Sequence, residues 1–225
     1  MPARTIAIGD VHGCSLALRA IVDAIHPGSD DSLIFLGDYI DRGPDSRGVL
    51  DFLMQLETRC QVIPLLGNHE IMLLEAEHNP QAFEPWLACG GAATVSSYDG
   101  QVTKIPPAHW EFMRRCRRYY ETDTHFFVHA NYAATVPLNR QPDYLLFWEH
   151  LHVHSPAAHQ NGKIAVVGHT AQKSGEVLDG GRVICLDTFC YGGGWLTAMD
   201  IDTGYLWQAN RDGTMRVNGE MTKHE

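Results

Sequence analysis

The 225-residue chain is short of positive charge: 17 Lys and Arg stand against 27 Asp and Glu, a formal net charge of −10. General nucleic-acid binding usually needs a basic patch or domain, so this balance argues against it. No apolar run approaches the length of a membrane span, and we expect no membrane partner. No internal repeat or low-complexity segment stands out. The charge says little about small phosphorylated substrates, because bound cations would dominate the local field.

Cysteine is present but not in metal-binding or redox spacing. None of the six cysteines belongs to a Cys-x-x-Cys pair, and Cys60 and Cys185 fall within predicted strands. This usage predicts reduced thiols that serve as small core hydrophobes. Residues 1–4 lead directly into the first predicted strand, which leaves no room for a secretory signal. We therefore expect a cytoplasmic protein, and the length suits one α/β domain with a full core.

Short apolar runs predict buried strands that alternate with amphipathic helices. The predicted strands span residues 5–8, 33–36, 60–66, 125–128 and 164–167. The predicted helices span residues 15–26, 46–57 and about 69–77. Such alternation predicts parallel strands joined by right-handed crossovers. Functional groups are then expected beyond the carboxyl ends of the strands.

The remaining stretches carry weaker patterns. Residues 79–123 are expected to form a helical insert over one edge of the site, with helices at 80–89 and 107–120 and a break at Gly90-Gly91. A short helix is predicted around residues 144–151. The tail predicts strands at 175–178, 182–186, 195–200 and 205–209, with hairpin turns at 179–181 and 202–204. The second half is thus expected to be mostly antiparallel or mixed sheet.

Polar groups follow five of the predicted strands. The stretches are Gly-Asp-Val-His-Gly at 9–13, Gly-Asp-Tyr-Ile-Asp-Arg-Gly at 37–43, Gly-Asn-His-Glu at 67–70, His-Ala at 129–130 and Gly-His-Thr at 168–170. The candidate metal ligands among them are Asp10, His12, Asp38, Asn68, His129 and His169. Oxygen and nitrogen donors without a thiolate favour Mn, Fe, Zn or Mg. A lone carboxylate such as Asp38 can bridge two cations about 3.5–4 Å apart.

Any one of these motifs is weak evidence, but their order along the chain is specific. Together they resemble the phosphoprotein phosphatase family of dinuclear metallophosphoesterases, and most closely its bacterial and phage-type serine/threonine phosphatases. The likeness runs from about residue 6 to residue 188. It implies a four-layer αββα sandwich with two mixed β-sheets, formed by one domain over residues 1–225.

The resemblance also implies a role for each candidate residue. One divalent metal ion would be bound by Asp10, His12 and Asp38, and a second by Asp38, Asn68, His129 and His169. Manganese is the first choice for these ions, with iron, zinc or nickel as alternatives. His69 would protonate the leaving oxygen, Asp41 would orient His69, and Arg42 would hold phosphate oxygens.

The implied reaction is hydrolysis of phosphoserine, phosphothreonine or phosphotyrosine esters by in-line attack of a metal-bound hydroxide. A symmetrical diadenosine tetraphosphate hydrolase of the same fold is the nearest alternative. A nuclease or cyclic-nucleotide phosphodiesterase is less favoured, since those relatives typically end in Gly-His-x-His and this chain has Gly-His-Thr-Ala at 168–171. A non-catalytic metal-binding scaffold is a distant third possibility, because every ligand position and His69 are present.

One departure from the family concerns phosphate binding. Members usually carry a second phosphate-binding Arg after a Trp, whereas His150 stands near that place here. His150, Arg140, or the insert residues Arg114 and Arg115 are the candidate replacements. The basic run at 114–118 is either helix-end charge or an electropositive lip for substrate.

Other polar residues near these motifs are open to two interpretations. Asp187 could support a ligand or cap a turn. His152, His154 and His159 are expected to be solvated loop residues and not a further metal site.

Overall fold

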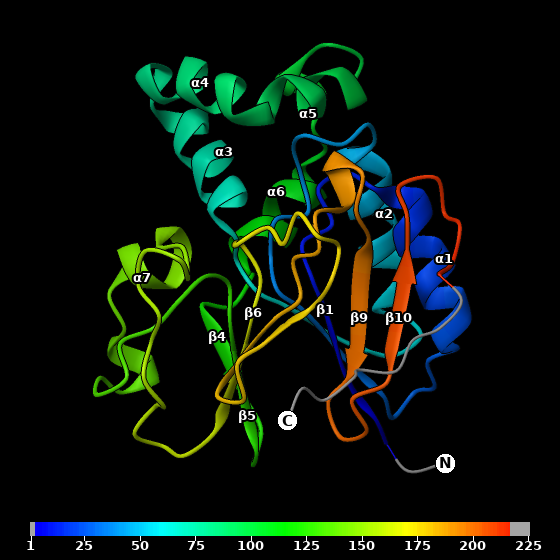
Figure 1. Ribbon diagram of the computed structural model, residues 1–225. Coiled ribbons are helices and arrows are strands. Elements are labelled where there is room, and N and C mark those ends of the chain that lie inside the picture. Colours follow the sequence, from blue (N-terminus) through cyan, green and yellow to red (C-terminus); the bar gives the residue numbers. More distant parts are fainter. Residues whose placement is uncertain (1–2, 217–225) are drawn as a thin grey trace.

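The computed structural model describes residues 3–216, and within them two five-stranded sheets form the centre of the molecule (Figure 1). The first sheet has the order β10-β9-β1-β2-β3 and the second β4-β5-β6-β8-β7. The first sheet comprises β1 (Thr5–Ile8), β2 (Ser32–Phe35), β3 (Gln61–Pro64), β9 (Leu196–Asp200) and β10 (Leu206–Ala209). The second comprises β4 (Tyr119–Glu121), β5 (His125–Val128), β6 (Ile164–Val167), β7 (Leu178–Asp179) and β8 (Val183–Cys185).

Both sheets are mixed, as the sequence predicts. In the first sheet β1 pairs in parallel with β2 and antiparallel with β9, so that Ile6 lies opposite both Leu33 and Asp200. In the second sheet β5, β6 and β8 are parallel. The antiparallel pairs β7–β8 and β9–β10 are the two hairpins that the sequence predicts.

Helices flank the two sheets and the ends of their strands (Figure 1). They are α1 (Ser15–Ile25), α2 (Ser46–Leu56), α3 (Asn68–His78), α4 (Pro80–Trp86), α5 (Ala92–Ser97), α6 (Pro107–Arg114) and α7 (Asp143–Trp148). A π-helical turn, η1 (Leu87–Gly91), joins α4 to α5, and 3₁₀ turns occur at η2 (Val102–Lys104), η3 (Leu138–Arg140) and η4 (Cys190–Gly192). Within residues 3–216 we find no helix long and apolar enough to cross a membrane.

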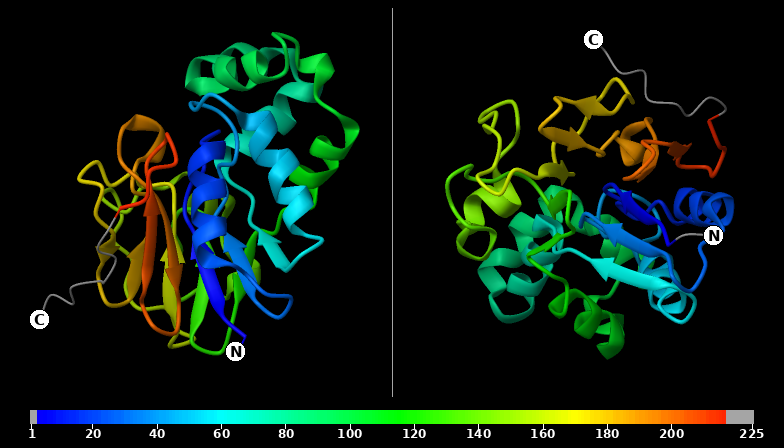
Figure 2. Two further views of the ribbon diagram at one scale, coloured as in Figure 1. Left: turned by 90° about the vertical axis from the view of Figure 1, so that its right-hand side faces the viewer. Right: turned by 90° about the horizontal axis from the view of Figure 1, so that it is seen from below.

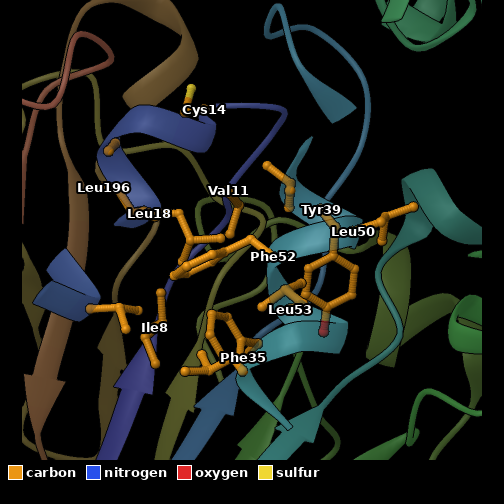
Figure 3. Close-up of a cluster of buried hydrophobic side chains, with 14 of the residues drawn as sticks. Ile8, Val11, Cys14, Leu18, Phe35, Tyr39, Leu50, Phe52, Leu53 and Leu196 are labelled. Atoms are coloured by element: carbon orange, nitrogen blue, oxygen red, sulfur yellow. The ribbon is translucent and has the colours of Figure 1, made fainter. Parts of the chain in front are cut away.

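Three buried apolar clusters separate four layers, and the period of two in each strand assigns side chains to them. On β1, Ile6 and Ile8 pack with α1 and α2, whereas Ala7 faces the second sheet. Figure 3 shows the first of these clusters, in which Ile8 lies with side chains of both helices. On β5, Phe127 faces the first sheet, while Phe126 joins the outer cluster that contains α7 residues. The layers are therefore helix, sheet, sheet and helix, which confirms the predicted αββα sandwich.

The helices of residues 80–114, the α4–α6 segment, lie beyond the ends at which β1 and β2 finish (Figures 1 and 2). The expected break at Gly90-Gly91 is a kink with φ of 117° at Gly90, and helix continues on both sides of it. The predicted helix 107–120 is wrong beyond Arg114. The chain there returns to the sheet, with Leu65 bridged to Arg117, and β4 then pairs with β5.

A second correction concerns the tail. The predicted strand 175–178 is reduced to β7 at Leu178–Asp179, and residues 175–177 lie in a turn. The six cysteines are all free, and four of them are buried as the prediction of core thiols requires, but Cys89 is exposed and Cys116 is half-buried. The prediction of one domain over residues 1–225 extends past the described residues at both ends.

Candidate metal centre

Five strands, three from the first sheet and two from the second, bring the predicted ligands to one end of the sandwich. Asp10 follows β1, Asp38 follows β2 and Asn68 follows β3, while His129 and His169 follow β5 and β6 of the second sheet. All six predicted ligands lie in this region, and five of them are buried. The carboxyl ends of neighbouring parallel strands share one sheet edge, which is why residues far apart in the chain meet here.

On the side of the second sheet, two imidazoles turn lone pairs toward one amide oxygen. His129 Nδ1–H donates to the carbonyl of Leu36 at 2.7 Å, and His169 Nε2–H donates to the carbonyl of Trp148 at 3.1 Å. The other nitrogen of each ring lies 3.0 Å from Asn68 Oδ1. Burial lowers the pKa of His129, and burial together with the neighbouring His129 imidazole lowers the pKa of His169 to about 3, so both rings are neutral near pH 7.

Asp38 connects this group to a second one. Its Oδ1 lies 3.5 Å from His129 Nε2, and its Oδ2 lies 3.4 Å from His12 Nε2. His12 Nδ1–H donates to the carbonyl of Ile40 at 2.8 Å, which leaves Nε2 with the lone pair. Burial also lowers the pKa of His12 well below its usual value. Two clusters that can hold a metal, His12-Asp38-His69 and Asp38-His129-His169, thus share Asp38.

Asp10 contributes a buried oxygen that no protein group satisfies. Its Oδ2 accepts the backbone N–H of His169 at 2.9 Å, whereas Oδ1 has no hydrogen-bond partner. Burial, with the charges of Asp187 and Asp38, raises its pKa well above the usual value. A Cβ on Gly168 would collide with Oδ1, so only glycine allows this approach of the β1 and β6 loops.

Two roles were open for Asp187, capping a turn and supporting a ligand. It caps a turn, and its second carboxylate oxygen remains available to support a ligand. Its Oδ1 accepts the backbone N–H of Phe189 at 3.1 Å, which is a turn cap. Its Oδ2 is buried without a partner, and burial raises its pKa to about 6. Converging lone pairs and unpaired carboxylate oxygens need a cation to offset their burial, and the donor set is that of hard or borderline divalent metals. The residues present therefore fit two such ions.

Beside the ligands lies a buried imidazole–carboxylate pair. His69 Nδ1–H donates to Asp41 Oδ2 at 2.7 Å, and His69 Nε2 is buried without a partner. Burial acts to lower the pKa of His69, but the charge of Asp38 and the hydrogen bond to Asp41 raise it above its usual value. This is the arrangement of a general acid with an orienting carboxylate.

Arg42 extends from the same loop and is exposed. Its Nη1 donates to His12 Nε2 at 2.9 Å, and its guanidinium lies 4.7 Å from the centre of the Tyr191 ring. Tyr191 also meets the His12 ring edge-on at 4.9 Å. Arg42 is thus adjacent to the candidate ligands. Tyr191 packs against both Arg42 and His12, a contact that the sequence did not reveal.

Glu70 is another residue whose role the sequence did not reveal. It is fully buried, and its carboxylate accepts backbone N–H groups of Asp38 at 2.9 Å, Tyr39 at 2.8 Å, Ile40 at 3.3 Å and Gly67 at 3.0 Å. One side chain therefore clamps the Asp38 loop to the start of α3.

Backbone strain concentrates at the site. Among the described residues, eight that are not glycine have positive φ, and five of them are site residues: His12, Asp38, Asp41, Arg42 and His169. Such conformations cost of order 1–3 kcal/mol each and persist where the surroundings over-determine them.

The candidates for a second phosphate-binding group are placed differently from one another. The His150 ring stacks on His169, with centroids 4.4 Å apart, and on His152 at 5.0 Å. Arg140 is exposed in η3. The insert arginines have other partners on the surface, since Arg114 pairs with Glu77 and Arg115 with Glu57. Of the four, His150 is the one in contact with a predicted ligand.

The prediction that His159 is solvated is wrong. It is 4% exposed, donates Nε2–H to the carbonyl of Val136 at 2.8 Å and packs against Phe126 and Tyr132. His152 and His154 are exposed, as expected. His152 borders a cavity of about 350 Å³ whose lining also includes Thr170, Gln172, Leu178 and Arg182.

The model of the calcineurin-like phosphoesterase family matches residues 3–202, most of the chain. The chain belongs to the calcineurin-like phosphoesterases. The chain is 32% identical over 139 residues to serine/threonine-protein phosphatase 1 of Salmonella typhimurium, a match of 57% of this chain and 59% of that protein. It is 33% identical over 109 residues to the symmetrical bis(5'-nucleosyl)-tetraphosphatase of Burkholderia pseudomallei, across 47% and 38% of the two chains. The matches thus span well under two thirds of either relative.

Solved structures agree with the fold. A proposed diadenosine tetraphosphatase superposes with a TM-score of 0.72 at 23% identity, covering 96% of this chain and 95% of that chain. A cold-active protein-tyrosine phosphatase of a psychrophilic Shewanella gives 0.67 at 18% identity, with coverage of 95% and 80%. The resemblance to metallophosphoesterases drawn from the sequence motifs is confirmed.

Proposed function

We propose that this phosphoesterase is a dinuclear metal-dependent phosphatase that hydrolyses phosphomonoesters, with phosphoserine and phosphothreonine, and also phosphotyrosine, as its substrate class. The observation that carries the proposal is the shared carboxylate of Asp38, which lies between two clusters of lone pairs. Its two oxygens face His129 on one side and His12 on the other. A single bridging carboxylate of this kind is typical of two-metal hydrolytic sites.

The chain offers one set of ligands for each ion. Asp10, His12 and Asp38 would bind the first, and Asp38, Asn68, His129 and His169 the second. We propose manganese as the resident metal, with iron, zinc or nickel as alternatives, because this donor set binds all of them. When bound, the two cations would neutralise charge on the phosphoryl group and activate a water nucleophile.

The remaining steps belong to the chain's own groups. Arg42 would bind phosphate oxygens through its guanidinium fork, for which a planar, permanently charged group is suited. His69 would hold a proton on Nε2 and pass it to the leaving oxygen, while Asp41 keeps Nδ1–H fixed. His150 would add a weaker donor where relatives carry a second Arg.

The second candidate function is symmetrical hydrolysis of diadenosine tetraphosphate. It is favoured by the relationship to the Burkholderia enzyme and by the cavity beside His152, which lies next to His150 at the edge of the site. That cavity has the volume of a small-ligand pocket. A non-catalytic metal-binding protein would have the ligands but no turnover.

Parallel assays with two substrates test the proposal. The metal-reconstituted protein is given a phosphoserine peptide and, separately, diadenosine tetraphosphate, and the products are separated. Phosphate from the peptide with an intact dinucleotide is the expected result. Formation of ADP with an inert peptide would establish the second candidate, and no product from either would support the scaffold.

The His69→Asn variant tests the assignment of the acid. We expect turnover of the phosphoserine peptide to fall by about 10²–10⁴-fold, the usual contribution of general acid catalysis, while metal content stays at the wild-type level. Metal content is measured by elemental analysis of the same sample. Loss of metal together with activity would mean that His69 is a ligand, which its place in one cluster makes a real alternative.

A further inference from the structure

Two side chains of the α4–α6 segment bind the carboxylate of Asp41. Trp86 Nε1–H donates to Oδ2 at 2.9 Å, and the Thr94 hydroxyl donates to Oδ1 at 2.6 Å. Neither contact is evident from the amino-acid sequence. We propose that Trp86 and Thr94 are positioning residues, which hold Asp41 and through it aim the His69 imidazole at the leaving group. This inference rests on the acid role of His69 in the proposed function.

The Asp41–Arg42 backbone needs such support. Both residues adopt left-handed φ values, 70° and 66°, which side-chain-bearing residues rarely adopt. The N–H of Asp41 lies 2.9 Å from Thr94 Oγ1 and 3.1 Å from Ser46 Oγ, and the N–H of Arg42 donates to the carbonyl of Gly90 at 3.1 Å. The α4–α6 segment thus binds both the backbone and the carboxylate of this strained dipeptide.

Trp86 is itself rigidly placed. The side chain is 0% exposed, and its ring lies 5.7 Å from that of Phe83. A Cβ on Gly91 would collide with the indole, so the backbone of η1 closes directly against the ring. Buried indoles usually find one hydrogen-bond acceptor for the N–H. Here that acceptor is the same oxygen that His69 uses.

The arrangement determines which proton is available for chemistry. Asp41 Oδ2 accepts from both Trp86 and His69, while Oδ1 accepts from Thr94. With the carboxylate held by these donors, His69 must present Nε2 to the site, where it has no protein partner. Supporting groups of this kind orient the residue that carries out the chemistry. A core tryptophan with an incidental hydrogen bond would have no such effect on proton donation.

Leaving-group dependence separates these two possibilities. Phenyl phosphate and p-nitrophenyl phosphate have similar size, but phenolate, with a pKa of about 10 like tyrosine, needs the proton far more than nitrophenolate. We measure kcat with both substrates for Trp86→Phe and Thr94→Val. Each variant is expected to lose about tenfold on phenyl phosphate and under about threefold on p-nitrophenyl phosphate, a partial loss of the general-acid contribution. Metal content should remain at the wild-type level.

Three further variants calibrate the result. His69→Asn gives the full effect of losing the acid. Thr94→Ser keeps a hydroxyl and should recover most of the phenyl phosphate activity. Trp110→Phe is the matched control, because Trp110 is a partly buried residue of α6 that packs beside Arg114. The melting temperature of each variant shows whether a general loss of structure is responsible.

The outcomes distinguish the inference from the function on which it rests. If His69→Asn shows no leaving-group dependence, the acid role in the proposed function fails. If His69→Asn shows it but Trp86→Phe and Thr94→Val behave like Trp110→Phe, the positioning role is overturned. Equal losses on both substrates, with a lowered melting temperature, would assign the two residues to stability alone and would overturn it too.

Discussion

The strand ends and the α4–α6 segment both contribute residues to the candidate site. They differ in how far apart in the sequence the cooperating residues lie. Each candidate ligand follows a strand within a few residues, as Asp38 follows β2. Trp86 and Thr94, in contrast, lie 45 and 53 positions from the Asp41 that they bind. The strand ends supply the candidate metal ligands, whereas the helical segment supplies contacts that hold the proposed acid and the proposed phosphate-binding residue.

This difference suggests a division of labour that can be tested. Changes at the strand ends should remove metal, and changes in the helical segment should leave metal in place and affect proton donation or phosphate binding. A variant in either region that disturbed the other function would break the division.

The largest effect is expected from Asp38→Asn. The substitution removes the one carboxylate that both clusters share, so neither ion keeps its full set of ligands. Metal-ion catalysis contributes several kcal/mol of charge stabilisation, so we expect activity to fall by about a thousandfold or more. Elemental analysis should show less than one metal ion per chain. Two retained ions would contradict the bridging role.

A smaller effect is expected from Glu70→Gln. An amide offers one acceptor oxygen where the carboxylate offers two, and here four backbone N–H groups depend on them. We expect metal affinity to weaken by about 10–100-fold, the usual result of losing a group that supports ligands. Titration of the metal-free protein with Mn²⁺ measures it. Unchanged affinity would show that the Asp38 loop keeps its shape without the clamp.

The Gly90→Ala variant tests the α4–α6 segment. Gly90 has φ of 117°, and a Cβ there would approach Arg42 Cγ to 2.8 Å. We expect a displaced Arg42, with KM for a phosphomonoester raised about fivefold, equivalent to roughly 1 kcal/mol. Metal content should be unchanged. If metal were lost as well, the separation of the two regions would not hold.

The smallest effect is expected from the Arg4–Asp31 ion pair, which is remote from the candidate site. Its removal is a control for both regions, because it should change stability alone. Asp31 accepts the backbone N–H groups of Arg4 and Gly28, each at 2.9 Å, and pairs with the Arg4 guanidinium at 2.6 Å. The hydrogen bond from that guanidinium lowers the pKa of Asp31 to about 2. Because the folded-state pKa lies below the unfolded value of about 3.9, ionised Asp31 stabilises the fold at neutral pH, and this is lost as pH falls toward 2.

Asp31→Asn should therefore lower the free energy of unfolding by about 1 kcal/mol at pH 7. The difference from wild type should shrink as pH drops below about 4. Urea unfolding at several pH values measures both quantities. Activity and metal content should match wild type, and a difference that persisted at low pH would mean that the ion pair is not its source.

The sequence predicted the site residues that lie within a few positions of a recognisable strand. An apolar strand, a glycine and a donor lie side by side in residues 33–38, so the pattern is visible in a short window. The same reasoning placed β1, β5 and β6 and the ligands that follow them. It also predicted the two hairpins, because their turns are encoded by Asp and Gly within three residues.

What the sequence did not predict depends on contacts between distant segments. The predicted helix over residues 107–120 includes Tyr119 and Tyr120, which form a strand because they pair with β5. The position of His159 in a predicted loop indicates a solvated side chain. In the structure Phe126 and Tyr132, which are distant in the sequence, enclose it. No local feature of the sequence around Trp86 points to a hydrogen-bond acceptor 45 positions away, so its contact with Asp41 was not predicted.

The strand order of the first sheet has a consequence for biosynthesis. β1 carries the loop with Asp10 and His12, and one of its two neighbours is β9, with Ile6 opposite Asp200. On a ribosome β9 emerges long after β2 and β3 have been made, so one edge of β1 has no partner until residues 196–200 have been synthesised. The nascent chain must therefore keep an apolar strand edge available over this interval, a stage at which such edges pair readily with other chains.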